Sequence, residues 1–444
     1  MDLVKLIMLK RMRVIINYLK YIFEGMRVPD TWHLMKPCDI LILTHDRERS
    51  YDFRGKPYAF LIDSLGEIFR KEDLKVSCVA KPYSVITDSK AYTFTYSYNR
   101  ASLIGQLCSL HTINVIIRFL IEPKVFHIVW KSSYLVKLWI YIIKRVKPKC
   151  IIGIQPDVNI CMAARRMGVD IYDLQHGVIS DSHPDYGQKY LDDSTTETLP
   201  TGYLCWDDQS VNVLSKWVIP KQIRTIKIGN LWFLRFIYPI QNDFLVHEAV
   251  NASKQIIDPY RPSILVSLQW GMRQFYPEKE FNGVMVKALE ETILETFEDY
   301  NWIVRLHPVQ LMGEEKESVT QYLIEVFGNE KADMWLDTSK LPLPLILKNV
   351  NLHITDFSSI VIEASWMGVR SGILNQEVKS GGKFEDYYVS ERNSGMAEVI
   401  DQNPEAIKSW ISKTLEKGKG DIQIPDTRDI RDAFIEEVVE KCRS

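Results

Sequence analysis

The sequence lacks several features that define large classes of protein. Its 444 residues contain no Gly-x-x-x-x-Gly-Lys-Ser/Thr loop and no Gly-x-Gly-x-x-Gly turn. Their absence argues against an NTPase or a nicotinamide-dependent enzyme. The seven cysteines are scattered and show no Cys-x-x-Cys spacing. This odd-numbered set indicates reduced thiols in a cytoplasmic protein, without a disulfide framework or a zinc site.

The sequence also lacks a long apolar run and a strong charge of one sign. No stretch approaches the roughly 20 apolar residues of a spanning helix, and Met1–Arg27 has no small-residue cleavage site of a signal peptide. The net charge of -2 excludes a broad nucleic-acid surface. With 46% hydrophobic and 25% charged residues, the composition is typical of a soluble globular protein. The length suits two domains of about 200 residues each.

Two segments combine apolar with basic residues, Met1–Arg27 and Tyr134–Lys149. Basic amphipathic helices of this kind can lie on an anionic membrane surface. The same pattern is shown by ordinary helices, whose apolar side faces the core and whose basic side faces solvent. The sequence leaves both interpretations open for each segment.

Apolar runs alternate with helical stretches throughout the chain, which predicts parallel sheets covered by helices. The predicted strands of the N-terminal half are Asp39–Thr44, Lys75–Ala80, Phe126–Trp130, Cys150–Ile154, Ile171–Leu174, Tyr203–Trp206 and Thr225–Ile228. Those of the C-terminal half are Ser263–Leu268, Trp302–Leu306, Met334–Leu336, Leu352–Thr355 and Gly372–Leu374. The predicted helices are Pro156–Met167, Phe281–Tyr300 and the final Asp429–Lys441.

This alternation predicts an α/β protein with two Rossmann-like domains whose parallel sheets face one another across a cleft. The predicted N-terminal domain comprises residues 1–235. The predicted C-terminal domain comprises residues 258–444. The sequence is also consistent with a last helix that packs back on the N-terminal domain.

In the C-terminal half, the strand ending at Thr355 runs into Asp356-Phe357-Ser358-Ser359 and then a helix. Ser358 and Ser359 would lie at the helix N-terminus, where unpaired N–H groups favour an anion. Glu363 would lie one turn further along, suited to accept hydrogen bonds from ribose hydroxyls. A plain serine cap explains this pattern as well.

Two other strand ends complete the predicted donor site. Pro308 stops the strand that ends in Arg305-Leu306-His307 and biases His307 towards an extended conformation. Arg305 and His307 would then project from the carboxyl edge, where open α/β sheets bind ligands, and hold a phosphate without a metal. Gln269 and Gly271 follow the first strand of this half and belong to the same predicted set.

The N-terminal half offers a candidate general base. Its strand Ile171–Leu174 ends at Gln175-His176-Gly177, which places His176 at the strand tip with a near-neutral intrinsic pKa. Asp173 and Asp157 are predicted to orient it or to act as nucleophiles. The polar loop that follows contains three further candidate ligands, Asp181, His183 and Asp185. Their spacing fits a metal site, but loop polarity explains it equally, and no metal site is predicted.

These motifs resemble those of GT-B-fold transferases that build bacterial capsules, O-antigens and teichoic acids. Arg305–Pro308 and Ser358–Ser359 are similar to the His-Pro and Ser-Ser motifs with which sialyl- and Kdo-transferases hold CMP. Gln175–Gly177 and Asp356–Ser359 resemble the Trp-His-Gly and Asp-Tyr-Ser-Ser segments of CDP-glycerol glycerophosphotransferases. The resemblance extends from about Cys150 to Leu374. The sialyltransferases have an acidic pair where this chain has Gln175-His176.

The resemblance implies a metal-independent glycosyltransferase that needs no cofactor, and the chain has no Asp-x-Asp metal motif. It implies a nucleotide-sugar donor bound by the C-terminal domain, with a CMP-sugar such as CMP-Kdo favoured. It also implies a lipid-linked or oligosaccharide acceptor, bound by the N-terminal domain, in surface polysaccharide biosynthesis. The expected location is the cytoplasm, peripherally on the inner face of the bacterial membrane. The alternatives are a teichoic-acid-type CDP-polyol phosphotransferase, a GT-B-fold sugar-nucleotide epimerase or hydrolase, and an inactive binding subunit.

Overall fold

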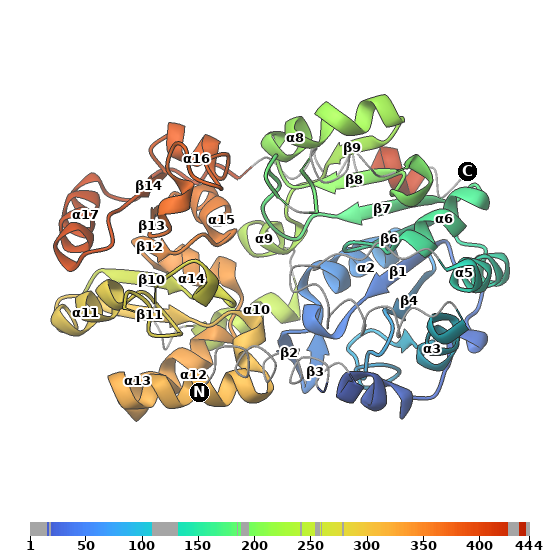
Figure 1. Ribbon diagram of the computed structural model, residues 1–444, viewed down its shortest axis with the longest axis horizontal. Helices are drawn as coiled ribbons and strands as arrows, with labels where there is room; N and C mark the ends of the chain where they lie inside the picture. Colours follow the sequence, from blue (N-terminus) through green and yellow to red (C-terminus); the bar gives the residue numbers. More distant parts are fainter. Residues whose placement is uncertain are drawn as a thin grey trace, which may run out of the picture. The chain divides into compact units, whose positions relative to one another are not determined.

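The chain forms two α/β units, each built on a parallel sheet (Figure 1). The computed structural model describes residues 16, 19–108, 132–183, 185–187, 195–239, 242–253, 258, 260–277, 279–424 and 435–440. Unit 1 consists of Met1–His176, Leu191–Ile228 and Arg428–Ser444, and unit 2 of Gly177–Tyr190 and Gly229–Thr427. The predicted α/β class with two parallel-sheet domains is confirmed.

Unit 1 contains a seven-stranded sheet in which all neighbouring strands are parallel. In spatial order its strands are β5 (Thr95–Tyr96), β4 (Val76–Ala80), β1 (Ile40–Thr44), β6 (Cys150–Gly153), β7 (Asp170–Leu174), β8 (Gly202–Cys205) and β9 (Arg224–Lys227). Its helices are α2 (Phe60–Lys71), α3 (Asn99–Cys108), α5 (Ser133–Val146), α6 (Val158–Arg166) and α8 (Asp208–Val218). Unit 1 also contains a small antiparallel hairpin of β2 (Tyr51–Phe53) and β3 (Lys56–Tyr58). Its short 3-10 helices are η1 (Trp32–Leu34), η2 (Asp46–Glu48), η3 (Thr196–Thr198) and η4 (Ile219–Lys221), and η8 (Ile435–Glu440) is a π-helix.

Helix α5 shows how the core of unit 1 forms. The apolar residues that the sequence places on one side of this helix, Leu135, Trp139, Ile142 and Ile143, are all buried. Trp139, Ile142 and Ile143 pack with residues of β1, β6 and α6. The apolar side of Tyr134–Lys149 is therefore used for the core, and the membrane-surface interpretation of this segment is wrong.

Unit 2 contains a five-stranded sheet, also parallel throughout. In spatial order its strands are β11 (Asn301–Arg305), β10 (Ser263–Ser267), β12 (Leu352–Thr355), β13 (Arg370–Ile373) and β14 (Ala397–Val399). Its helices are α9 (Leu231–Ile237), α10 (Phe244–Ser253), α11 (Lys287–Glu295), α12 (Gly313–Phe327), α13 (Asn329–Ser339), α14 (Leu343–Asn349), α15 (Ile360–Trp366), α16 (Val389–Asn393) and α17 (Pro404–Lys417), with short turns η5 (Met272–Gln274), η6 (Pro308–Leu311) and η7 (Gln376–Val378).

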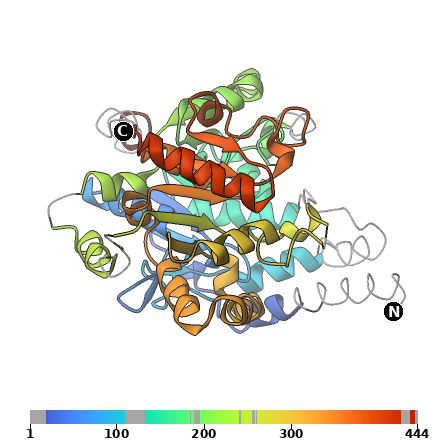
Figure 2. The same cartoon turned by 90° about the vertical axis from the view of Figure 1, so that its left-hand side faces the viewer.

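One face of this sheet is covered by helices from distant parts of the chain. Helices α11 and α17 pack side by side, as the foreground of Figure 2 shows. Leu289 and Ile293 of α11 and Ile407 and Ile411 of α17 belong to the same buried core as strands β10 and β12. This packing fixes the strands whose carboxyl ends form the candidate donor site.

Each sheet reverses its winding at the strand that comes first in its sequence, β1 in unit 1 and β10 in unit 2. In unit 1 the chain passes from β1 to β4 on one side and returns to β6 on the other. In unit 2 it passes from β10 to β11 and returns to β12. Open α/β sheets bind ligands at such switch points, outside the carboxyl ends of the strands.

Most predicted strands are present, with differences that have local causes. Met334–Leu336 is not a strand but part of helix α13, in which Trp335 is buried with Ala332 and Thr338 at helical spacing. The predicted helix Phe281–Tyr300 starts later, at Lys287, because the side chain of Asn282 accepts the N–H groups of Val284 and Met285 and holds a turn. The predicted strand Phe126–Trp130 lies outside the described residues.

The predicted boundary between the domains differs from the observed one at Gly177–Tyr190. This segment belongs to unit 2, whereas the sequence placed it in the N-terminal domain. Two hydrogen bonds join the segment to unit 2, because Ser182 donates its N–H and its hydroxyl to Asp386 at 2.7 and 2.5 Å. In the part of the chain that the structure describes, no helix is long and apolar enough to cross a membrane.

A buried histidine holds the middle of the unit 2 sheet. His353 of β12 is 0% exposed, with its Nε2 2.6 Å from the hydroxyl of Ser267 and its Nδ1 2.9 Å from that of Ser371. Burial lowers the pKa of His353 from 6.5 to about 3. The imidazole is therefore neutral in the folded protein at any pH well above 3.

We expect this histidine to make the free energy of unfolding depend on pH in the acid range. Between pH 6.5 and about 3 the unfolded chain binds a proton that native His353 does not. The free energy of unfolding therefore decreases as the pH is lowered through this window, by at most about 1.4 kcal/mol per pH unit for one proton. Urea unfolding at pH 4 to 7 should show a shallower pH dependence for His353→Gln than for the wild type. The exposed His247 supplies the control, because His247→Gln should follow the wild-type curve.

Candidate functional site

His307 at the carboxyl end of β11 is a neutral hydrogen-bond donor. The ring Nδ1 accepts the backbone N–H of Val309 at 3.2 Å, and the backbone N–H of His307 donates to Gln310 Oε1 at 2.8 Å. Burial lowers the pKa of His307 to about 4. The ring proton must therefore sit on Nε2 at neutral pH. Within the described residues this Nε2 has no hydrogen-bond partner, so it is available to a ligand.

Arg305, two residues earlier, uses only part of its guanidinium for hydrogen bonds within the protein. Its Nη1 donates to the carbonyl oxygens of Thr338 and Leu341 at 3.2 and 2.8 Å. Burial lowers the pKa of Arg305 to about 10, against the attraction of Glu363, and the group stays cationic at neutral pH. Its Nε and Nη2 have no recorded partner among the described residues. The predicted phosphate contact therefore rests on these two nitrogens.

Glu363 of α15 is buried, not open to a ligand. Its Oε1 accepts a hydrogen bond of 3.2 Å from Asn230, which itself caps α9 by accepting the N–H of Phe233. Burial raises the pKa of Glu363 to about 8 even though Arg305 lowers it. The carboxyl is thus largely protonated at neutral pH. Its predicted contact with a ribose remains a prediction.

The Ser-Ser turn contributes fewer free hydroxyls than the sequence suggests. Ser358 is buried and its Oγ accepts the N–H of Ile360 at 3.3 Å, which is the capping role. Thr355 donates its hydroxyl to Ser267 O at 2.9 Å inside the sheet. Ser359, the residue before α15, makes no side-chain capping bond. Its hydroxyl is the one of the three that the described structure leaves for a ligand.

The loop after β10 lies at the same edge. Gln269 is half-buried without a recorded partner among the described residues, Trp270 is 55% exposed, and Gly271 adopts φ +79°. A side chain with a Cβ would be strained at that φ. This conformation lets the chain turn sharply directly after Trp270.

An aromatic group that the sequence did not reveal lies next to the Ser-Ser turn. Phe357 stacks on Phe384 with ring centroids 5.0 Å apart, and Phe275 contacts both rings. Lys383 lies over the Phe384 ring at 5.1 Å. These residues come from separate loops, so no local sequence pattern could have grouped them.

In unit 1 the predicted catalytic residues have unequal surroundings. His176 lies two residues after the end of β7 and is exposed. Asp173 is buried and accepts the N–H of Gln155 at 2.8 Å. Asp157 caps α6 by accepting the N–H of Asn159 at 2.8 Å. Both carboxylates thus hold local structure, and His176 remains the best placed of the three.

The side chain of Gln175 forms hydrogen bonds within the unit 1 sheet and its loops. It donates to the hydroxyl of Ser210 at 2.9 Å and accepts the N–H of Trp206 at 2.7 Å. These bonds join the end of β7 to the loop after β8. The Gln-His-Gly motif therefore combines a structural residue with an exposed histidine.

The structure adds residues that sequence reasoning missed, in the loop after β1. His45 accepts the N–H of Arg47 on Nδ1 at 3.1 Å, and its Nε2 lies 3.1 Å from the hydroxyl of Tyr21. Glu48 Oε2 accepts the N–H of His45 at 3.1 Å. A signal was present, because a His-Asp-Arg-Glu run directly follows a predicted strand, as the other motifs do.

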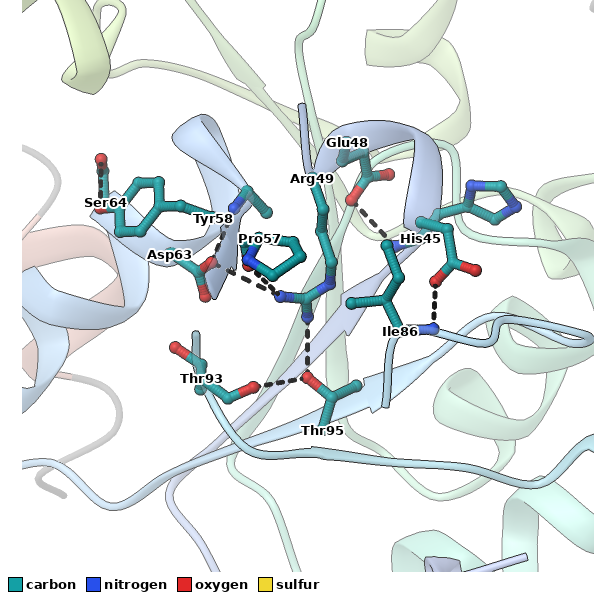
Figure 3. Close-up of polar contacts among 12 residues, drawn as sticks. His45, Glu48, Arg49, Pro57, Tyr58, Asp63, Ser64, Ile86, Thr93 and Thr95 are labelled. Carbon is teal, nitrogen blue, oxygen red and sulfur yellow. Dashed lines mark hydrogen bonds and ion pairs between the residues drawn. The ribbon is translucent and has the colours of Figure 1, made fainter. Parts of the chain in front are cut away.

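A buried ion pair supports this loop (Figure 3). Arg49 donates to the Thr95 hydroxyl at 2.7 Å, and its Nη1 lies 3.6 Å from Asp63 Oδ2, with both side chains almost fully buried. Asp46, one turn earlier, accepts the N–H groups of Val85 and Ile86 at 2.7 and 3.2 Å. The loops after β1 and β4 are thus fixed to each other and to β5.

The Asp181–Asp185 loop shows turn geometry. His183 Nδ1 accepts the N–H of Asp185 at 3.1 Å, and Ser182 is bound to Asp386 as described above. Across the residues that the structure describes, no group of three or more histidine, cysteine, aspartate or glutamate side chains is arranged to hold a metal ion.

Comparison with known proteins identifies the fold. No protein-family model matches the chain, and no curated protein matches it. A Methanocaldococcus jannaschii UDP-GlcNAc 2-epimerase, solved with UDP-GlcNAc and UDP, matches with TM-score 0.53 and 13% identity over 90% of this chain and 99% of its own. The S. aureus MnaA–UDP structure matches with TM-score 0.51 and 14% identity over 92% and 98%.

The wall teichoic acid polymerase TagF, solved as a variant with CDPG, matches with TM-score 0.51 and 11% identity over 98% of this chain and 94% of that chain. At these identities the likeness establishes the fold and not the activity. The predicted GT-B-type fold is confirmed. The specific resemblance to sialyl- and Kdo-transferases has no counterpart among these structures.

We expect the Arg49–Asp63 pair to be essential for the stability of unit 1. The change Arg49→Met keeps most of the side-chain volume but leaves Asp63 buried without its cation, which should cost about 3–5 kcal/mol in the free energy of unfolding. The exposed Arg166–Glu197 pair, at 2.7 Å, is the control, because Arg166→Ala should cost less than about 1 kcal/mol. Urea unfolding measures both. Equal, small losses would contradict the role assigned to Arg49.

Proposed function

We propose that this protein is a glycosyltransferase that moves a sugar from a nucleotide donor to a hydroxyl acceptor in surface polysaccharide biosynthesis. One observation carries the proposal. Polar groups without partners in the described structure gather at the carboxyl edge of the unit 2 sheet, namely Gln269, the Nε2–H of His307 and the Ser359 hydroxyl. Buried or half-buried polar groups are normally paired, so unpaired donors at a switch point suit an absent polar ligand.

The chemistry of these donors suits a phosphate that leaves with the nucleotide. A neutral histidine N–H, a serine hydroxyl and the free nitrogens of Arg305 are hydrogen-bond donors fixed in advance by their own backbone and packing. Donors fixed in this way stabilise charge that develops on an oxygen. We propose that they act without a metal ion.

We propose a cytidine nucleotide as the donor, because Arg305–Pro308 and Ser358–Ser359 resemble CMP-binding motifs. The structural neighbours were solved with UDP and with CDPG, which supports a nucleotide-activated donor in general. A polyol-phosphate transferase is the second candidate, since the match to TagF extends over 98% of this chain. That enzyme would leave a phosphodiester in its product. An epimerase would convert its donor without an acceptor.

On the acceptor side we propose His176 as the general base. It is an exposed imidazole at the carboxyl end of β7, and removal of a proton from the acceptor hydroxyl would activate the nucleophile. The lipid-linked or oligosaccharide acceptor itself is a proposal from the resemblance.

The two histidines should separate binding from turnover. A thermal-shift screen with CMP, CDP, UDP, GDP and ADP first identifies the nucleotide, since a ligand that binds the native state raises the midpoint temperature of thermal unfolding. His307→Ala should then weaken binding of that nucleotide by about tenfold or more, because a hydrogen bond to a charged phosphate is lost. His176→Ala should bind it normally but turn over about 10²–10⁴ times more slowly.

The exposed His247 provides the matched control, and His247→Ala should change neither quantity. If none of the five nucleotides shifts the wild-type midpoint, the assignment of unit 2 as a nucleotide site fails. If His307→Ala binds as tightly as the wild type, the site lies elsewhere in unit 2.

We further propose that Met1–Arg27 attaches the protein reversibly to the inner leaflet of the membrane. The segment carries Lys5, Lys10, Arg11, Arg13, Lys20 and Arg27, and each basic residue near an anionic surface contributes about 1 kcal/mol. Co-sedimentation with anionic vesicles at low salt should exceed that with neutral vesicles and should decline at high salt. Reversing Lys10, Arg11 and Arg13 to glutamate should abolish it. Pelleting that ignores lipid charge would count against the proposal.

A further inference from the structure

The carboxyl end of β1 in unit 1 carries charged groups that the proposed reaction does not yet use. Lys81 follows β4, and its ammonium reaches across β1 to the carbonyl oxygens of Ile154 and Gln155, at 2.5 and 3.2 Å. Gln155 is held at φ +47°, which is unfavourable for a residue with a side chain. Such backbone persists only where surrounding contacts enforce it, and it concentrates at functional sites.

Two cations at this edge retain unused hydrogen-bond donors. Lys81 has three N–H groups, and two of them point to the carbonyls just described. Arg47 is exposed, and the described residues offer its guanidinium no hydrogen bond or ion pair. Both cations lie close enough to His45 to lower the pKa of its imidazole, which falls to about 4 chiefly through burial. His45 is therefore neutral, and it does not compete for an anion as a third cation would.

Glu48, at the end of η2, lies near Lys81 at the same edge of the sheet. One of its oxygens accepts the N–H of His45, and the Thr44 side chain also interacts with the carboxyl group. Burial raises the pKa of Glu48 to about 7, against the attraction of Lys81 and Arg49. Asp46 and Asp63, the other carboxyl groups nearby, are already bonded to backbone N–H groups.

We propose that the carboxyl end of β1 binds a phosphate group of the acceptor, through Arg47 and Lys81, with Glu48 protonated in the complex. The proposal rests on the proposed function, in which unit 1 binds the acceptor. Two cations with free donors match the charge of a phosphate dianion. A protonated Glu48 donates a hydrogen bond to the anion, whereas an ionised one repels it. The acceptor is accordingly a phosphorylated one, such as a phosphate-linked carrier or a polyol phosphate.

The proposal predicts that anion binding takes up a proton at Glu48. Sulfate is a suitable probe because it remains a dianion across the range in which Glu48 titrates. Affinity for sulfate should be highest below about pH 6 and should fall as the pH rises through 7, since ionised Glu48 then opposes the anion. A loss of about tenfold between pH 5.5 and 8.5 corresponds to a one-unit shift of the Glu48 pKa on binding.

The measurement is a thermal-shift titration of the full chain with sulfate against chloride at constant ionic strength. Glu48→Gln should bind sulfate tightly at every pH in the range. Arg47→Gln and Lys81→Met should weaken binding by about tenfold or more, and the exposed Arg47 keeps the test valid if Lys81→Met does not fold. The neighbouring hairpin provides controls of the same charge change, Asp52→Asn and Lys56→Met, which should behave as the wild type.

Persistence of the pH dependence in Glu48→Gln would overturn the proposal, because the titrating group would then not be Glu48. Unchanged affinity in Arg47→Gln would overturn it equally. Glycerol 3-phosphate should displace sulfate from the wild type; failure to do so would mean a site for the free ion and not for a phosphorylated acceptor. The nucleotide screen is independent of these results, so failure of the donor site and failure of this anion site are distinguishable.

Discussion

The arrangement of both candidate sites depends on parallel pairing of one interior strand of each sheet, β1 or β10, with neighbours from distant parts of the chain. In unit 1, β1 pairs in register with β4 on one side and β6 on the other. In unit 2, β10 pairs with β11 and β12 in the same way. Parallel pairing brings all carboxyl ends to one edge. Residues as far apart in sequence as Lys81 and Gln155 are thereby placed within hydrogen-bond distance.

Burial at these edges sets the protonation states that the chemistry needs. His307 and His45 have pKa values lowered to about 4, so both are neutral donors or acceptors at neutral pH. Glu363 and Glu48 have pKa values raised to about 8 and about 7, so each can carry a proton under physiological conditions. In all four cases burial is the largest cause, because the charged form loses more hydration than the neutral form.

The two units use their motifs differently. In unit 2, Thr355 and Ser358 hold the strand and the helix start, which leaves His307, Ser359 and Gln269 for a ligand. In unit 1, Asp173 and Asp157 hold turns, and the cations with unused donors, Arg47 and Lys81, belong instead to the loops after β1 and β4. Residues chosen for their chemistry in the sequence thus divide into those that position the site and those that remain available to it.

The sequence alone determined the α/β class and most strands, because buried parallel strands are apolar runs and the turns after them carry polar motifs. It also placed His307 and His176 correctly at strand ends. It did not reveal that Met334–Leu336 is helical, because three adjacent apolar residues fit either state and only the packing of Trp335 decides. The Phe357–Phe384 stack and the Lys81–Glu48 edge appear only in the tertiary structure. Their members come from separate loops, and the pKa values depend on burial, which local sequence does not encode.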